Sequence, residues 1–575
     1  MDEQTKPLPA DGGSTRIAKV LETVVGIPSA LLVALSIALL AVSAVFVTCY
    51  AQMGGDAGTI TVLSEFGASG SVRQIVVPLL VAAGAVAMVV AIRRPLRAWS
   101  TAGVVIACLV ASLAIQCVWT GIFMTGAYHF NDTIQIDAYA QALNSGDMSL
   151  FVGADEWTDP VTGSVPSYLI RVPYQAGMVW LFAGIYQMFG AGNLNAIMVL
   201  NIVANMVSIG CLLGIVATTS HGDEGQDGDI PLKLTALAVV AFLPFLMSAT
   251  FVYSNAIAFA FMMLACLVSA MAWARDGQSY LTDGASMVGA AVLMALAIML
   301  KQTFMLFSIV LFLCWLVHVL RRGRPLLVLP VLVMGYAFLH AVDLPIWCLE
   351  QATGVDFGDG QPLFANITVG LTWSQGNNAP GWYNPAAMDC YNQTDGSIAA
   401  QTQWCLNYIG DRLGEMKADP GYAAYFFRYK IASEWLDPTY QSCWFSACAG
   451  CDHPWADWAL NNTDNNILLV SVLDGIQTVI YALSAVGFGS ALGRLRRHAL
   501  PLWQLMLVGM TLIGLVVYLL WEAQAMYILP FAFMMLPMAA IGGSVVYNRV
   551  DRKAETRTKA KEGHDGDQPD AGGVA

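Results

Sequence analysis

The chain has 575 residues, of which 57% are hydrophobic and only 12% charged, and its formal net charge is −13. Soluble proteins average about 45–50% apolar and about 25% charged residues. This composition, with a mean hydropathy of +0.60, excludes a soluble enzyme, a nucleic-acid-binding protein and a disordered scaffold. We therefore expect a polytopic, all-α membrane protein that binds membrane lipids and no nucleic acid.

Apolar stretches of the length that a membrane-crossing helix needs follow one another along the chain. The first is preceded by a polar leader, 1–23, and lacks a small-residue cleavage site, so we interpret it as a span and not as a signal peptide. At roughly 20 residues for each crossing, we expect about 12 spans. The stretches lie near residues 24–49, 73–92, 99–124, 172–190, 194–218, 232–249, 251–274, 285–320, 326–347, 467–490, 500–521 and 523–546.

Clusters of Lys and Arg give the orientation, because basic residues gather at the cytoplasmic ends of spans. Placing all five clusters in the cytoplasm puts segments 125–171 and 348–466 outside the plasma membrane. Two spans in 285–320 would put an odd number of spans between Arg97 and Arg321, which cannot then both be cytoplasmic. We therefore expect one bent span or a re-entrant pair there. The clusters are Arg16 with Lys19; Arg93, Arg94 and Arg97; Arg321, Arg322 and Arg324; Arg494, Arg496 and Arg497; and the basic residues after 547.

The net negative charge is concentrated in the two outer segments. Segment 348–466 has thirteen acidic and four basic residues, a net −9, and segment 125–171 has six acidic residues and Arg171, a net −5. The rest of the chain is therefore nearly neutral. This distribution indicates that the polar chemistry lies on the outer side of the membrane.

Half of the twelve cysteines lie in apolar spans, where a thiol behaves as a small hydrophobic group. The other half lie in or beside segment 348–466, where an even number predicts up to three disulfides in fifteen possible pairings. The alternative is a zinc site at Cys448, Cys451 and His453, which lacks a second paired motif. We therefore predict no metal site. The outer cysteines are Cys348, Cys390, Cys405, Cys443, Cys448 and Cys451.

Asp132 lies shortly beyond the third apolar stretch, at the water interface. Residues 133–143 have the apolar pattern of a short amphipathic helix on the membrane surface. Apolar surroundings disfavour a charged carboxylate, so Asp132 would be more basic than usual and suited to act as a general base. The alternative is a structural role for Asn131 or Asp132 as N-cap of this helix. Asp137, five residues after Asp132, lies on a somewhat different face of this helix from Asp132.

An ordered series of motifs across residues 120–540 resembles the GT-C glycosyltransferases, in the branch of protein O-mannosyltransferases and the aminoarabinose transferase of lipid A. The series begins with Asp132 in the first large outer loop. The two stretches before residue 98 precede it as an N-terminal addition. The further motifs are Gly146-Asp147, Tyr168, Pro173-Tyr174-Gln175-Ala176-Gly177, Phe189-Gly190, Asn201, Phe251-Val252-Tyr253-Ser254-Asn255, Leu300-Lys301-Gln302-Thr303, Pro380-Gly381-Trp382-Tyr383-Asn384 and Trp521-Glu522-Ala523-Gln524-Ala525-Met526-Tyr527-Ile528-Leu529-Pro530.

The resemblance implies transfer of a sugar, with inversion, from a polyprenyl-phosphate donor to an extracytoplasmic glycan, lipid or protein. Asp132 would be the general base, with Asp137 in reserve. The phosphate leaving group needs a cation. Arg171 is the first candidate because guanidinium matches phosphate oxygens, and Lys301 is the second because an ammonium in an apolar stretch needs a partner or a function. The resemblance implies no cofactor, although the use of a divalent cation is left as an open alternative. The expected substrate-binding residues are Tyr174, Gln175, Trp382, Tyr383, Glu522 and Tyr527.

Each candidate also has a structural interpretation. Arg171 fits a snorkelling anchor, Lys301 a turn or a cytoplasmic flank, and Glu522 a solvated carboxylate. A single Trp or Tyr of segment 348–466 fits a core position or an interface anchor better than a sugar-stacking position. For the whole protein, the alternatives are a lipid-linked sugar flippase or transporter and a non-catalytic membrane protein whose outer domain binds a partner.

The predicted fold is a GT-C-like bundle of about 12 transmembrane helices with a disulfide-stapled outer domain. The predicted segments are a cytoplasmic leader 1–23, two additional N-terminal helices in 24–98, a GT-C-like membrane module 99–347 with its first outer loop at 125–171, an extracytoplasmic domain 348–466, C-terminal helices in 467–546 and a cytoplasmic tail 547–575.

Overall fold

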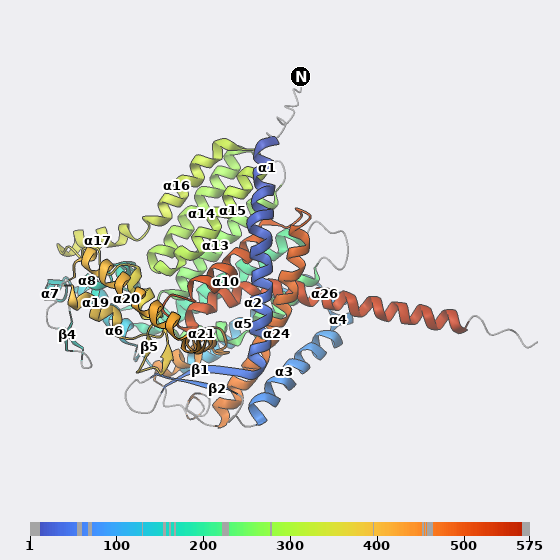
Figure 1. Cartoon of the computed structure of the whole chain (residues 1–575), viewed down its shortest axis with the longest axis horizontal. Coiled ribbons are helices and arrows are strands. Elements are labelled where there is room, and N and C mark those ends of the chain that lie inside the picture. The colour runs from blue at the N-terminus through green and yellow to red at the C-terminus, as the bar shows by residue number, and fades with distance from the viewer. Residues whose placement is uncertain are drawn as a thin grey trace, which may run out of the picture.

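The structure is a computed structural model that describes residues 12–53, 60–66, 72–128, 130–152, 157–159, 163–165, 168–220, 229–275, 279–394, 396–450, 454, 456, 460 and 464–565. Most of its elements are helices (Figure 1). Up to residue 220 they are α1 (Gly12–Leu21), η1 (Glu22–Gly26), α2 (Ile27–Phe46), β1 (Val47–Met53), β2 (Ile60–Phe66), α3 (Val72–Ala91), α4 (Arg93–Ala98), α5 (Thr101–Ile122), α6 (Asn131–Ser145), α7 (Ser149–Val152), β3 (Trp157–Asp159), β4 (Gly163–Val165), α8 (Tyr168–Arg171), η3 (Pro173–Gln175), α9 (Ala176–Phe189) and α10 (Leu194–Ser220).

The elements that follow lead through the membrane bundle, into segment 348–466 and back. They are α11 (Ile230–Ala241), α12 (Leu243–Met247), η4 (Ser248–Thr250), α13 (Asn255–Ala274), α14 (Tyr280–Leu300), η5 (Gln302–Phe304), α15 (Met305–Arg321), η6 (Pro325–Leu327), α16 (Val328–Leu339), α17 (Asp343–Thr353), α18 (Phe364–Gly370), β5 (Trp373–Ser374), β6 (Ala379–Pro380), α19 (Ala386–Gln393), α20 (Ile398–Ala418), α21 (Pro420–Trp435), α22 (Ser442–Cys448), α24 (Asp464–Leu495), α25 (Leu502–Val517) and α26 (Ala525–Asp565). The strands pair antiparallel as β1–β2, β3–β4 and β5–β6.

Among the described residues, eight helices are long and apolar enough to cross a membrane, or up to ten if each of two bent helix pairs counts as one span. The bent pairs are Ile230–Ala241 with Leu243–Thr250, at 57°, and Pro325–Leu339 with Asp343–Thr353, at 45°. Two shorter apolar helices, Val76–Ala91 and Leu502–Val517, fall below the length of a candidate span. The chain is thus a multi-pass, all-α membrane protein, as predicted, but the described residues do not confirm twelve spans.

The stretch 285–320 differs from the expected single bent span or re-entrant pair. It forms two helices, α14 and α15, each of which is a candidate span, with Lys301 in an extended conformation between them. The apolar stretch between Arg97 and Arg321 that does not form a span is 172–190. Its helix α9 has only 14 residues and is not a candidate span. Instead, α9 lies along α6, where Asn144 Nδ2 donates to Ala183 O at 2.8 Å. Hydropathy alone could not show that α9 packs on another helix of the first loop.

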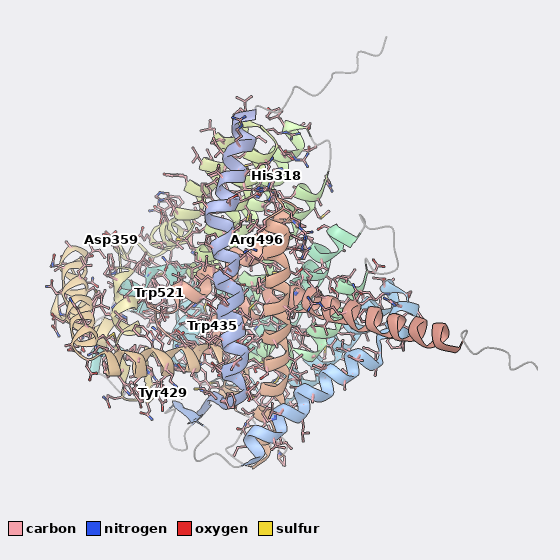
Figure 2. All side chains as sticks on the ribbon, turned by 45° about the vertical axis from the view of Figure 1, so that its right-hand side comes forward. His318, Asp359, Tyr429, Trp435, Arg496 and Trp521 are labelled. Atoms are coloured by element: carbon pink, nitrogen blue, oxygen red, sulfur yellow. The ribbon has the colours of Figure 1, made fainter. Side chains whose placement is uncertain are left out.

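The bundle has two chemically different ends. We call one the Asp132 end, because it contains Asp132, Lys301 and Trp521, and the other the arginine end, because Arg321 and Arg496 lie there. In Figure 2, Trp521 lies in the half of the molecule that holds α17 to α21, and Arg496 lies toward the opposite half. The contacts that follow belong to one end or the other.

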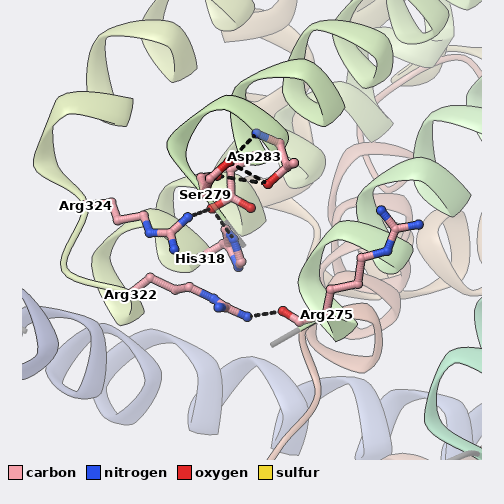
Figure 3. A network of polar contacts seen from close by, with 7 residues as sticks. Arg275, Ser279, Asp283, His318, Arg322 and Arg324 are labelled. Atoms are coloured by element: carbon pink, nitrogen blue, oxygen red, sulfur yellow. Dashed lines mark hydrogen bonds and ion pairs between the residues drawn. The ribbon is translucent and has the colours of Figure 1, made fainter. Parts of the chain in front are cut away.

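Buried ion pairs hold the arginine end together. Asp283 of α14 is fully buried and pairs with Arg324, while His318 Nε2 lies 3.6 Å from Asp283 Oδ2 (Figure 3). Beside them, Arg322 Nη2 donates to Arg275 O at 2.5 Å. Because a buried carboxylate needs a paired cation, these contacts fix the connection between α15 and α16 against the start of α14.

The predicted disulfide staple is not supported. The cysteines among the described residues are all free thiols. Cys390 Sγ and Cys405 Sγ lie 3.5 Å apart, well beyond the roughly 2.05 Å of a disulfide bond. Cys451 and His453 of the alternative zinc site lie outside the described residues. Helix packing, including the buried Cys390 and Cys405 on α19 and α20, therefore organises segment 348–466.

Candidate functional site

Asp132 lies in the first turn of α6, at the Asp132 end of the bundle. The helix begins at Asn131, and its N-cap is Phe130 with no side-chain capping bond, so the alternative in which Asp132 serves as N-cap is wrong. The half-buried Asp132 carboxylate instead accepts a hydrogen bond through Oδ2 from Tyr253 Oη at 3.4 Å. Thr133 Oγ1 donates to Val252 O at 2.7 Å, which fixes the start of α6 on the segment that carries Tyr253.

A buried polar chain extends from Asp132 through Tyr253. Gln175 Nε2 donates to Tyr253 Oη at 2.5 Å and to Tyr168 Oη at 3.3 Å. Tyr168 also hydrogen-bonds Asp132. All three partners are buried, so their hydrogen bonds hold the carboxylate in place without freely exchanging with water.

Lys301 reaches the same place because the end of α14 is fixed from two sides. Ser254 Oγ donates to Leu300 O at 2.7 Å. At the start of α9, a Cβ on Gly177 would lie only 1.8 Å from Met299 O, so glycine allows the two backbones to touch. The ammonium of Lys301 then lies 4.7 Å from the centre of the Tyr253 ring and 6.0 Å from that of Tyr527, where ring faces attract a cation.

Glu522 lies in the turn between α25 and α26. Gln524 Nε2 donates to Glu522 Oε1 at 3.2 Å, and Ala523 N donates to Gly381 O at 2.7 Å. Glu522 interacts electrostatically with both Asp132 and Lys301. The site thus combines two carboxylates with one ammonium, although these residues are far apart in the sequence.

Burial governs the protonation of this site. It raises the pKa of Asp132, and the charges of Lys301 and Arg171 with hydrogen bonds from two tyrosines offset part of that increase. Burial, followed by the like charge of Asp132, raises the pKa of Glu522 to about 7, while Gln524, Lys301 and Lys430 hold it down. Burial also lowers the pKa of Lys301, which Asp132 and Glu522 raise. Both carboxyls are therefore more basic than in water.

Arg171 and Tyr174 border the site. The charge of Arg171 lowers the pKa of Asp132, and its Nη1 contacts the thioether of Met388 at 2.6 Å. A thioether is a weak acceptor, so this contact leaves guanidinium donors for an anion. Burial raises the pKa of the half-buried Tyr174, followed by the charges of Glu522 and Asp132. Tyr174 therefore stays a neutral phenol beside both carboxyls.

Three expected site residues lie elsewhere. Asp137 binds Tyr186 Oη of α9 at 2.5 Å and Gln141 Nε2 at 3.0 Å. Trp382 is only 1% exposed and donates through Nε1 to Ser433 Oγ at 2.9 Å, so in this structure it occupies a core position, which was the alternative to sugar stacking. Tyr383 is 57% exposed, and its carbonyl accepts a hydrogen bond from Ser374 Oγ at 2.6 Å.

The structure also adds residues that sequence reasoning did not select. Tyr253 contacts Asp132, Gln175 and Lys301 at once, and Tyr168 joins Gln175 and Asp132. Both tyrosines stand in motifs that resemble the GT-C family, and that was the available signal. Lys430 interacts with Glu522, but the sequence carried no signal for it. Nothing in its sequence neighbourhood indicates that this lysine is buried.

Comparisons with known proteins concern the fold. No protein-family model and no curated protein matches the sequence. Among solved structures, ArnT from Cupriavidus metallidurans bound to undecaprenyl phosphate is similar with a TM-score of 0.32 and 14% identity over 77% of this chain and 78% of that one. The archaeal oligosaccharyltransferase AglB from Archaeoglobus fulgidus, in complex with an inhibitory peptide and a dolichol-phosphate, is similar with a TM-score of 0.38 and 13% identity.

The match with AglB covers 80% of this chain and 52% of that one, so the chain spans about half the length of AglB. Similarities at this level carry no information about the site.

Proposed function

We propose that the chain is a membrane glycosyltransferase that moves a sugar from a polyprenyl-phosphate donor to the hydroxyl group of an extracytoplasmic acceptor. The observation that carries the proposal is a half-buried carboxylate, Asp132, held by Tyr253 next to the ammonium of Lys301, where membrane helices end. A base and a phosphate-binding cation at the membrane surface are what transfer from a lipid-linked donor needs.

The donor phosphate would bind between Lys301 and Arg171. Lys301 is poorly solvated, and this burial lowers the pKa of its ammonium. A charged partner stabilises such a group more strongly than it stabilises one in water. Arg171 offers a guanidinium that can bind two phosphate oxygens at once. The lipid chain of the donor would lie beside the membrane helices, which explains why both cations stand at the ends of apolar segments.

The transfer itself is a displacement at the anomeric carbon of the sugar. The acceptor oxygen forms a new bond to this carbon, while the bond from the carbon to the phosphate oxygen breaks and its electron pair leaves with the polyprenyl phosphate. Asp132 takes the proton of the acceptor hydroxyl, and its raised pKa makes it a better base. Lys301 stabilises the charge that develops on the departing phosphate. Attack opposite the leaving group inverts the anomeric configuration.

The remaining polar groups position the reactants. Tyr253 and Tyr168 direct the Asp132 carboxylate. Glu522 and Tyr174 interact electrostatically with each other and with Asp132, and this carboxylate and phenol can bind the hydroxyl groups of the sugar. Tyr527 presents its ring to Lys301 and would keep the ammonium in place when the donor is absent.

The decisive experiment compares two aspartates that lie on the same helix. Purified full-length protein in nanodiscs receives a radiolabelled undecaprenyl-phosphate or dolichol-phosphate sugar and a mixture of envelope acceptors. We expect Asp132→Asn to lose about 10²-fold or more of the transfer rate, the usual range for a general base, and Asp137→Asn to retain it, since Asp137 binds Tyr186 and Gln141.

Equal rates for the wild type and Asp132→Asn, with unchanged thermal unfolding, would remove Asp132 from the chemistry. Sugar that crosses a vesicle membrane without forming a new glycosidic bond would identify a flippase or transporter instead. Adding EDTA to the same assay tests the divalent cation that the family resemblance leaves open.

A further inference from the structure

A second lysine, Lys430 of α21, is buried outside the proposed chemistry. Its side chain is fully buried, and Nζ donates to two main-chain carbonyls, Gly370 O and Trp521 O, each at 2.6 Å. Gly370 ends α18, and Trp521 directly precedes Glu522. One ammonium therefore ties segment 348–466 to the turn that carries a carboxylate of the proposed site.

Glycines permit this contact. A Cβ on Gly370 would lie 2.1 Å from Leu520 O and 2.4 Å from Trp521 O. Gly381 has a φ of +77°, and a Cβ added there would lie 2.9 Å from Lys430 Cε and 3.0 Å from Lys430 Nζ. Its carbonyl accepts from Ala523 N at 2.7 Å. We call Gly370, Gly381 and Lys430, with the turn Trp521–Ala523 that they hold, the clasp.

The clasp gives a role to a motif that the chemistry does not use. In Pro380-Gly381-Trp382-Tyr383-Asn384, Gly381 binds Ala523, and Asn384 Nδ2 donates to Val369 O at 3.1 Å and to Trp382 O at 2.8 Å. These bonds hold the motif beside the end of α18. The motif thus supports the turn at Trp521.

Charged groups surround the ammonium on two sides. Glu434 lies on the same helix, one turn later, and Glu522 lies in the turn. Burial lowers the pKa of Lys430 to about 8, while these two carboxyls raise it, so the ammonium persists at neutral pH. Glu522 in turn faces Asp132, Lys301 and Lys430. The loss of Lys430 would therefore alter both the position and the charge environment of Glu522.

We infer that Lys430 is a positioning residue for the transfer: by joining the carbonyls of Gly370 and Trp521, it fixes Glu522 beside Asp132 and Lys301. The inference rests on the proposed function for its kinetic consequence, although the clasp itself does not. Lys430 touches neither Asp132 nor Lys301 in any described contact, and it acts through the position of the turn and the charge environment of Glu522.

The test uses the full chain in nanodiscs and two variants that separate position from charge. Lys430→Met removes the ammonium. Gly381→Ala keeps it but adds a methyl group 2.9 Å from Lys430 Cε. The matched control is Lys233→Met, which removes another buried lysine, whose Nζ binds the main-chain carbonyls Leu96 O and Trp99 O. The first readout is hydrogen exchange of the Ala523 amide, whose bond to Gly381 O belongs to the clasp.

We expect Ala523 to exchange at least about tenfold faster in both clasp variants, because opening the clasp frees its amide. The value of kcat should fall about tenfold or more with KM for the donor nearly unchanged, since misplacement by about 1 Å can cost this much. In Lys430→Met the pKa of the Glu522 carboxyl should rise, because a cation that holds it down is lost. Gly381→Ala, which keeps the ammonium, should leave the pKa of Glu522 in place.

Unchanged exchange of Ala523 in Lys430→Met overturns the inference, and so does an equal loss of kcat in Lys233→Met. If Lys430→Met does not fold, Gly381→Ala decides by the same two readouts. A wild type without any transfer activity would refute the proposed function, and hydrogen exchange would still decide whether the clasp exists.

Discussion

Replacement of Lys301 by methionine tests the donor site. Methionine has a similar length and keeps the packing against Tyr253 but removes the charge. A charge-assisted hydrogen bond contributes about 1.5–3 kcal/mol, and about 1.4 kcal/mol corresponds to a tenfold change in Kd. Because the ammonium lies 4.7 Å from a ring centre and is partly desolvated, we expect the upper part of this range, a loss of roughly 30–150-fold in affinity for undecaprenyl phosphate.

The same substitution should also change the pH dependence. Lys301 lowers the pKa of Asp132 and of Glu522. Without it, both pKa values rise, Glu522 further above about 7, and a base that must be deprotonated becomes active only at higher pH. The rising limb of the rate profile should therefore shift upward in Lys301→Met and return in Lys301→Arg, which restores the charge.

The assay is a titration of nanodisc-embedded protein with radiolabelled undecaprenyl phosphate. Lys233→Met serves as the control, since it removes a buried lysine whose Nζ binds Leu96 O and Trp99 O. A Kd for Lys301→Met within threefold of the wild type, in protein that unfolds at the wild-type temperature, would refute the donor-binding role of Lys301.

Three further substitutions separate the site from the scaffold. Tyr253→Phe should lower the transfer rate about tenfold, the value of one hydrogen bond to a charged group, while its ring still stacks on Phe251 at 5.2 Å; an unchanged single-turnover rate would contradict this. Trp382→Ala should cost about 3–5 kcal/mol of stability in thermal unfolding without a change in KM, whereas a raised acceptor KM in stable protein would restore a sugar-stacking role. Asp283→Ala leaves Arg324 without its buried partner and should destabilise the fold by about 3–5 kcal/mol at a constant rate per folded molecule; a lower rate per folded molecule would show coupling between the two ends of the bundle.

The sequence was sufficient to predict a helical membrane protein and the main candidates at the Asp132 end. Asp132, Lys301 and Glu522 could be selected because a charged residue at the edge of an apolar stretch is costly without a purpose. Tyr253 could not be ranked above other tyrosines, since its importance comes from touching Asp132 and Lys301, and these contacts join three distant segments.

Two differences between the sequence expectation and the structure have a common physical origin. Composition measures how apolar a residue's neighbours in the sequence are, but it does not reveal what those neighbours pack against. The helix α9 is apolar enough to resemble a span, yet it lies against α6. Trp382 resembles a surface for a sugar, yet it fills the core beside Ser433. In both cases a tertiary partner decided the role, and no local pattern encodes that partner.

The contact at Gly177 bears on how such a protein can vary over evolutionary time. The backbone of α9 meets that of α14 where any side chain would collide with Met299 O. This glycine has no functional group, but it determines where Lys301 can stand. In a survey of tolerated substitutions, Gly177 would be as intolerant of change as the charged residues. It would then be mistaken for a participant in the chemistry. The freedom of this enzyme-like site to adapt to new substrates is therefore limited by a position that never meets them.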